Sequence, residues 1–355
     1  MNEKIRGLDG LKGIAAIFIA YVYHYCILFA ANPFSSNVVM DKLFCGINIY
    51  AGYGEAVFFL MSGFLMSYVY KKRIKKQGWK EFFLPRMKRI YPLMIATVMV
   101  VFAFENLGKL LLGEYPLYGV HGEIQYGWGS LLLSVLGLQT GYISDGDLHS
   151  VNGPAWYISI LFLCYMISYV FIKKIKNEKH LLFSIFFMFL LGVVIAANHG
   201  FSVPLFYSCC GRGFVGFFLG MLMEYFVDVK KPISPLVSIL LIGEIVGMLY
   251  LIEALWSPQK MVLTELFVYP TSLYLVLKSP GIQNLLDKKI PRYIGRISYH
   301  IYLLNFPILV GIAFISKLMN GSLDYNNPLV WLGITAGSLF ISSVVYRGKF
   351  LFLKS

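Results

Sequence analysis

Residues 13–31 read GIAAIFIAYVYHYCILFAA, an apolar stretch of 19 residues without Asp, Glu, Lys or Arg. A helix needs about 17–25 such residues to cross the hydrocarbon core of a bilayer. Basic residues precede the stretch, as they do in a secretory signal peptide, but it lacks a small-residue cleavage signature. The stretch therefore predicts a membrane helix that is retained in the protein.

The composition of the whole chain agrees with a membrane protein. Of the 355 residues 58% are hydrophobic and 14% are charged, against about 45–50% and about 25% in soluble domains, which excludes a soluble globular protein and a disordered chain. The net charge of +13 would indicate nucleic acid only if the basic residues formed one soluble face. They lie between apolar runs instead, so we expect no nucleic-acid partner. The five cysteines show no paired spacing and predict neither a disulfide framework nor a metal site.

The number of crossings follows from the apolar runs and from the positions of the basic residues. Ten runs have spanning length, at about 11–31, 53–70, 90–112, 155–172, 180–198, 211–228, 235–252, 261–277, 297–316 and 328–346. An eleventh run, 128–143, is shorter and rich in Gly, Ser and Thr. If it does not cross, 26 of the 31 Lys and Arg residues fall on one side of the membrane, as the positive-inside rule requires.

We therefore predict an all-α polytopic membrane protein with about ten transmembrane helices. Both termini are expected in the cytoplasm, and 128–143 is expected to be a non-crossing segment at the outer face. Because there is no internal repeat and no linker, residues 1–355 are predicted to form a single membrane-embedded domain.

The first run contains an ionisable residue deep in the membrane. His24 follows Lys12 by twelve residues, which is about 18 Å along a helix. An ionisable side chain at that depth is a functional hypothesis by default. The alternative is a neutral histidine that hydrogen-bonds a neighbouring helix.

Two further segments combine polar residues with an apolar run. FFLMSGFLM, 58–66, contains Ser62 and Gly63, and such small residues also serve close helix packing. FLPRMKRIYP, 83–92, places Arg86 and Arg89 on one helix face at the inner surface. That pair can anchor anionic lipid headgroups or hold phosphate oxygens in bidentate geometry; without further context, lipid anchoring is favoured.

The remaining polar residues leave alternatives open. SDGDLHSVNGPAWYIS, 144–159, contains an Asp-x-Asp-x-His string, for which a solvated loop before a Trp-anchored helix is favoured over a metal site. Glu55 lies near the outer end of its run, where it can be solvated. Glu244 and Glu265 lie inside later runs as substrate-facing carboxylates or as partners of Tyr and Ser. In IGRISYHIYLLNFPIL, 294–309, Tyr302 and Asn305 can line a cavity or hydrogen-bond across helices.

Five segments in this order resemble the acyltransferase 3 family of polytopic membrane acyltransferases. They are GLDGLKGIAA followed by His24, then FFLMSGFLM, FLPRMKRIYP, NGPAWYIS and IGRISYHIYLLNFP, and they extend from residue 7 to about 309. The resemblance implies an enzyme that uses cytoplasmic acyl-CoA to O-acylate glycans or other molecules at or beyond the membrane. It also implies that His24 takes part in catalysis and that Arg86 and Arg89 bind the phosphates of CoA.

The sequence departs from the family pattern at three positions. Lys12 replaces the usual first-helix arginine and lies one residue further from the histidine, so its place in the donor site rests on a weaker match. Ala56 stands where an acidic residue is usual, and Asn305 where a late histidine is common. Candidates for lining the substrate site are Ser62, Asn152, Trp156, Tyr302 and Asn305.

The expected function is transfer of an acyl group, of which acetyl is the first choice, to a glycan hydroxyl in the cell membrane. The expected partners are acyl-CoA as co-substrate, a glycan or lipid-linked sugar acceptor, and membrane lipids; no bound cofactor is expected. His24 would act as general base or as transient acyl carrier. The competing hypothesis is a transporter or flippase for a lipid-linked saccharide, although the paired inverted repeats typical of transporters are absent from the sequence.

Overall fold

The computed structural model describes residues 5–52, 54–117, 122–141, 149–197, 206–253, 257–321 and 323–352. Within these ranges the elements are helices, and none is a β-strand. The first half of the chain forms α1 (Leu8–Phe18), η1 (Ile19–Tyr23), α2 (His24–Phe29), α3 (Val38–Ala51), α4 (Glu55–Leu65), η2 (Met66–Tyr70), α5 (Lys71–Ile74), α6 (Trp79–Leu112), α7 (Gly122–Gln125), α8 (Trp128–Leu136), η3 (Gly153–Ala155) and α9 (Trp156–Lys174). The second half forms α10 (Glu178–Ala197), α11 (Ser208–Phe226), α12 (Pro235–Glu253), α13 (Ser257–Leu263), η4 (Thr264–Val268), α14 (Tyr269–Lys278), α15 (Pro280–Leu286), α16 (Lys289–Leu318) and α17 (Pro328–Phe352).

Eight helices of the described chain are long and apolar enough to cross a membrane: Leu8–Phe29, Trp79–Leu112, Gly153–Lys174, Glu178–Ala197, Pro235–Ile252, Lys260–Lys278, Lys289–Leu318 and Pro328–Gly348. The other two predicted spans are also helical, as α4 with η2 and as α11. The total of ten crossings, and which end faces the cytoplasm, stay predictions. In the segment 128–143, α8 has nine residues, about 14 Å of helix, which is too short to cross the hydrocarbon core.

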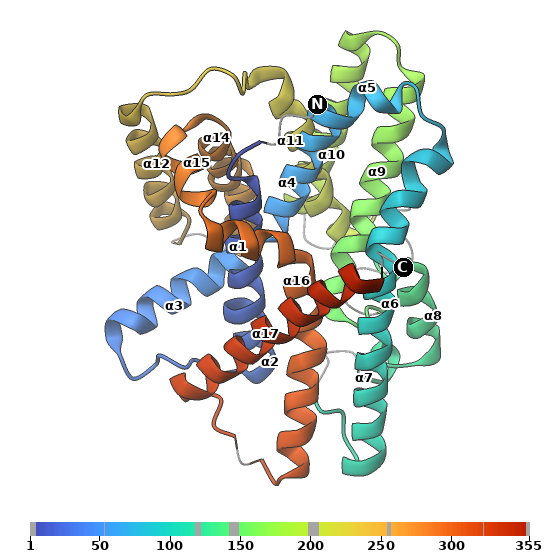
Figure 1. The fold of residues 1–355 in the computed structure, drawn as a ribbon, viewed down its shortest axis with the longest axis vertical. Helices are drawn as coiled ribbons and strands as arrows, with labels where there is room; N and C mark the ends of the chain where they lie inside the picture. The colour runs from blue at the N-terminus through green and yellow to red at the C-terminus, as the bar shows by residue number, and fades with distance from the viewer. Residues whose placement is uncertain are drawn as a thin grey trace.

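Two close helix crossings form the centre of the bundle. Helix α1 packs against α16 where Gly13 meets the backbone of Gly295; a Cβ atom added to Gly13 would lie 2.8 Å from the amide nitrogen of Gly295. Helix α4 crosses α11 in the same way, with Gly63 against the carbonyl of Phe217 and Gly220 against that of Leu60. Figure 1 shows α1 and α16 side by side in the middle of the molecule. Small residues at such crossings let two helix backbones touch.

One end of the bundle, which we call the basic end, carries the short helix α5 with Lys71, Lys72 and Arg73. It lies at the top of Figure 1. Lys71 Nζ donates to Glu178 Oε2 at 2.6 Å and to the Tyr225 hydroxyl at 3.0 Å, so the ends of α10 and α11 meet α5 there. At the same end, the Lys278 ammonium donates to the carbonyl of Asp228.

Candidate functional site

A cavity of about 480 Å³ opens at the basic end. Its lining comes from α1, α4, α5, α6, α9 and α16, with one residue from η2 and one from the segment between α5 and α6. The lining residues are Lys12, Phe58, Met61, Ser62, Leu65, Tyr70, Arg73, Gln77, Glu81, Pro85, Arg86, Arg89, Ile90, Tyr157, Ile158, Leu161, Tyr165, Ser298, Tyr299 and Tyr302. Five of the predicted site residues are among them, from four different helices: Lys12, Ser62, Arg86, Arg89 and Tyr302. Because these residues are up to 290 positions apart in the sequence, their meeting in one cavity is a result of the fold.

Aromatic rings hold the Arg86 guanidinium in the cavity wall. Its carbon lies 3.7 Å from the ring centre of Phe82 and 4.5 Å from that of Tyr70. Its Nη1 donates to the Phe82 carbonyl at 2.6 Å. A guanidinium has five N–H donors in a fixed plane, so one bond to a carbonyl leaves most of them for a ligand. Arg89 lies one turn further along α6 and is exposed.

His24 lies beyond the deep end of this cavity, behind Tyr302. It is 8% exposed, and its ring centre is 6.2 Å from that of Tyr302. Asn305 Nδ2 is 3.3 Å from His24 Nδ1, so these two side chains link α2 and α16 inside the bundle. Residues 19–23, directly before His24, form a π-helix, a feature that is frequent at functional sites because it displaces side chains from the regular helical rows.

The segment NGPAW, 152–156, contains η3 and the first residue of α9 and contacts α16 beside the site. Asn152 Nδ2 donates to the carbonyl of Leu303 at 3.3 Å, and the Tyr302 hydroxyl donates to the carbonyl of Pro154 at 2.8 Å. Both bonds fasten this segment to α16 at the level of Asn305. Trp156 does not line the cavity. Its ring faces the guanidinium of Arg212, and the guanidinium carbon lies 4.9 Å from the ring centre of Trp156.

The structure also reveals a buried ionic cluster, which we define as Glu55, Arg212 and Glu265. Arg212 Nη2 lies 3.5 Å from Glu55 Oε2, and Arg212 Nε lies 3.6 Å from Glu265 Oε1. Glu55 is 2% exposed, so the interpretation of a solvated carboxylate is wrong at this position. The sequence analysis did not predict this cluster. The sequence shows only that two carboxylates and one guanidinium occupy similar depths in three apolar runs, and it does not show that these runs meet.

Other predicted groups lie apart from the cavity. Glu244 faces Thr271 on α14, with 3.5 Å between Thr271 Oγ1 and Glu244 Oε1. His149 Nδ1 pairs with the Ser130 hydroxyl at 2.8 Å, which ties it to α8. Asp145 and Asp147, the acidic part of the Asp-x-Asp-x-His string, lie outside the described residues.

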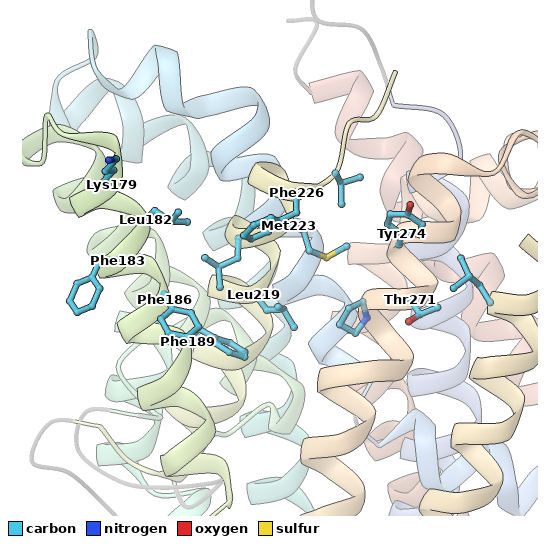
Figure 2. Close-up of a pocket in the computed structure, with 14 residues that line it drawn as sticks. Lys179, Leu182, Phe183, Phe186, Phe189, Leu219, Met223, Phe226, Thr271 and Tyr274 are labelled. Atoms are coloured by element: carbon cyan, nitrogen blue, oxygen red, sulfur yellow. The ribbon is translucent and has the colours of Figure 1, made fainter. Parts of the chain in front are cut away.

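A second hollow of about 840 Å³ opens between α10, α11, α12 and α14. Figure 2 shows Phe186 and Phe189 on its α10 wall and Thr271 and Tyr274 across from them on α14. Its lining is almost entirely apolar and contains none of the predicted site residues. The smaller cavity is therefore the better candidate, because it brings cations, hydroxyl groups and the approach to His24 together.

Two comparisons with known proteins name acyl transfer. A family model described as an acyltransferase domain matches residues 5–347. An O-acetyl transferase of Shigella phage Sf6 is 25% identical over 236 residues, which are 63% of this chain and 63% of the phage protein. A Rhizobium radiobacter protein, "Protein 2 in picA locus", is 30% identical over 163 residues, 43% of this chain and 75% of that protein. The match thus spans less than two thirds of the phage relative's length. No solved structure matches the chain.

Proposed function

The chain belongs to the acyltransferase 3 family, and on that premise we propose that it transfers an acetyl group from acetyl-CoA to a hydroxyl of a cell-surface or exopolysaccharide glycan. The phage relative's name, O-acetyl transferase, supports the acyl group and the kind of bond formed. Acyl-CoA is here a co-substrate, and the side chains of the protein catalyse the reaction.

The observation that carries the proposal is the cavity between the basic end and His24. Arg86 and Arg89 lie at its basic end, and Tyr302, beside His24, lines its deep end. A molecule with phosphates at one end and a thioester on a long flexible arm at the other matches this arrangement of charge and depth. Guanidinium groups bind phosphate oxygens through paired charge-assisted hydrogen bonds, and the apolar and aromatic walls suit the arm.

The chemistry assigned to His24 is general-base catalysis. The hydroxyl oxygen of the acceptor attacks the thioester carbonyl carbon while the imidazole takes its proton. The C–S bond then breaks, the new ester bond remains, and the thiolate of CoA leaves and receives the proton from the imidazolium. Such a base contributes about 10²–10⁴-fold to the rate.

The orientation in the membrane follows from the same proposal. The basic end faces the cytoplasm, where acyl-CoA is available and where positively charged loops are retained. Both termini are then cytoplasmic, and the protein lies in the plasma membrane among anionic lipids. The acceptor reaches His24 from the opposite side, so an acetyl group crosses while CoA stays on its own side.

The test of His24 uses radiolabelled acetyl-CoA with membranes that contain the protein. His24→Ala is expected to lower the transfer of label to the glycan fraction by at least about a hundredfold. His180→Ala, which changes an exposed histidine at the start of α10, is the matched control and is expected to retain full transfer. Undiminished transfer by normally inserted His24→Ala protein would refute the assignment.

The test of the donor site compares two cations on α6. Arg86→Ala is expected to weaken acetyl-CoA binding about tenfold or more, because charge-assisted hydrogen bonds to phosphate are lost. Lys88→Ala is the control, since Lys88 is exposed on the same helix and does not line the cavity. Equal effects of the two changes would contradict a donor-binding role of Arg86 and favour lipid anchoring instead.

A further inference from the structure

We propose that the buried ionic cluster of Glu55, Arg212 and Glu265 is the binding site for the acceptor, and that it takes the hydroxyl groups of a neutral sugar residue. This inference rests on the proposed function, because it supplies the second substrate of the same reaction. It assigns a binding role to three side chains that the donor cavity does not include.

The cluster lies at about the same depth as His24. Glu55 precedes the last residue of η2, Tyr70, by fifteen positions; Arg212 precedes the last residue of α11 by fourteen, and Glu265 precedes the last residue of α14 by thirteen. These helix ends all lie at the basic end, so each charged group is about 20 Å from it. His24 is about 18 Å from Lys12 on the same scale.

A short chain of contacts connects the cluster with His24. Arg212 Nη2 donates to the carbonyl of Gly52 at 3.2 Å. Gly52 lies against the ring of Tyr23, since a Cβ atom at Gly52 would come within 2.6 Å of Tyr23 Cε2. The ring centre of Tyr23 is 5.6 Å from that of His24. The cluster and the catalytic histidine are thus neighbours across one layer of side chains.

The cluster is not complete by itself. Two carboxylates face one guanidinium, and Glu265, which is 1% exposed, receives no hydrogen bond on either carboxylate oxygen from the described residues. Its separation of 3.6 Å from Arg212 Nε is longer than a hydrogen bond. A buried carboxylate without donors is costly. Glu265 also lies in the π-helix η4, as the residue before His24 lies in η1.

The composition of the cluster indicates the class of ligand. Carboxylate oxygens accept hydrogen bonds from hydroxyl groups, and a guanidinium donates to hydroxyl oxygens. Trp156, 4.9 Å from the Arg212 guanidinium, adds an aromatic face against which the C–H face of a sugar ring can pack. The two acidic side chains offset the charge of the guanidinium, so the cluster does not favour an anionic ligand. Together these groups fit a neutral sugar with several free hydroxyls, and the side chain of Arg212, 19% exposed, is the part that an entering ligand meets.

The test replaces Glu265 by its neutral isostere. The probe is the glycan fraction extracted from the producing cells, with radiolabelled acetyl-CoA as donor. Glu265→Gln is expected to raise the KM for the glycan about tenfold or more while the KM for acetyl-CoA stays unchanged. Its melting temperature in detergent is expected to be unchanged or higher, because a buried carboxylate without hydrogen-bond donors is removed.

Two further variants complete the test. Glu244→Gln, which changes another intramembrane carboxylate outside the cluster, is expected to leave both KM values unchanged. Trp156→Leu is expected to raise the KM for the glycan and to leave that for acetyl-CoA unchanged. If the Glu265→Gln protein does not insert into the membrane, the glycan KM of Trp156→Leu alone tests whether the cluster binds the acceptor.

The outcomes are separable. An unchanged glycan KM in both Glu265→Gln and Trp156→Leu overturns the acceptor site. A lower melting temperature with equal rises in both KM values overturns it too, because the cluster is then an ion pair that supports the fold. No labelling of glycan by the wild-type protein refutes the proposed function itself, independently of the cluster.

Discussion

At the residue scale, the partner of His24 determines which ring nitrogen can act. Asn305 Nδ2 lies 3.3 Å from His24 Nδ1, and Asn305 Oδ1 is buried without a hydrogen bond among the described residues. For Nε2 to accept a proton, Nδ1 must carry one and needs an acceptor. A half-turn of the Asn305 amide brings its oxygen to Nδ1 and supplies that acceptor. We therefore propose that Asn305 is a positioning residue for His24.

Substitutions of Asn305 test this role. Asn305→Leu removes the acceptor and is expected to lower kcat at least about tenfold with the KM for acetyl-CoA unchanged. Asn305→Asp keeps an acceptor and adds a negative charge that favours the imidazolium. It is expected to retain activity with the acidic limb of the pH–rate profile moved to higher pH. Wild-type rates and profiles in both variants would contradict the role.

Single polar residues inside apolar runs could be predicted from the sequence, whereas contacts between distant runs could not. His24, Arg86 and Arg89 stand out because a charge or an ionisable ring interrupts an apolar run. The contact of Glu55 with Arg212 and of Arg212 with Glu265 joins three distant segments. Hydrophobic periodicity tells which residues share a face of one helix, but it does not tell which helices meet, so this cluster could not be predicted.

At the element scale, the crossing of α1 and α16 sets the geometry of the site. Helix α1 carries Lys12 and continues through η1 to His24, while α16 carries Tyr302 and Asn305. The two helices touch at Gly13 and Gly295, where the Cβ of any other residue would meet backbone atoms. Backbone cannot give way as the end of a flexible side chain can, so the distance between the two helices is fixed at that point.

Enlarging one glycine tests the crossing. In Gly295→Ala the new methyl group overlaps the carbonyl of Asp9, and the free energy of unfolding is expected to fall by about 1–3 kcal/mol. Transfer activity is expected to fall with it, because Lys12 and His24 move relative to α16. Thermal unfolding in detergent measures the first effect, and the labelled acetyl-CoA assay measures the second.

Gly281→Ala is the matched control for this change. Gly281 lies in α15 with no atom within 4 Å of an added Cβ, so its substitution is expected to leave stability and transfer nearly unchanged. Equal effects at Gly281 and Gly295 would contradict the account of the crossing.

The helical elements themselves were largely predictable from the sequence. The predicted runs recur as helices in the described chain, and in the described part of 128–143, residues 128–141, the helix is the nine-residue α8. Counting basic residues on either side of that run distinguished it from a span, which apolar length alone does not do. The π-helices η1, η2 and η4 had no signal in the hydrophobic pattern of the sequence.

At the scale of the whole molecule, the proposed route of the acetyl group requires that the basic end faces the cytoplasm. Lys75 lies in the segment after α5 at that end, and Glu114 follows α6 at the other end, where it pairs with Lys317 Nζ at 2.7 Å. Single cysteines at these two exposed positions report which side of the membrane each end faces.

Labelling of intact cells with a membrane-impermeant maleimide tests this orientation. In a chain with the exposed Cys45 changed to Ser, Glu114→Cys is expected to be labelled at once and Lys75→Cys only after the cells are permeabilised. The reverse pattern would place the basic end outside and contradict the proposed route of the acetyl group.

If one cavity presents acyl-CoA to His24, a structure of the protein with a bound, non-hydrolysable acetyl-CoA analogue will show the analogue in that cavity. We expect density for the phosphates beside Arg86 and Arg89 and for the acyl carbonyl beside Tyr302 and His24. Density for the analogue in the apolar hollow between α10 and α14, or phosphates away from both arginines, would contradict it.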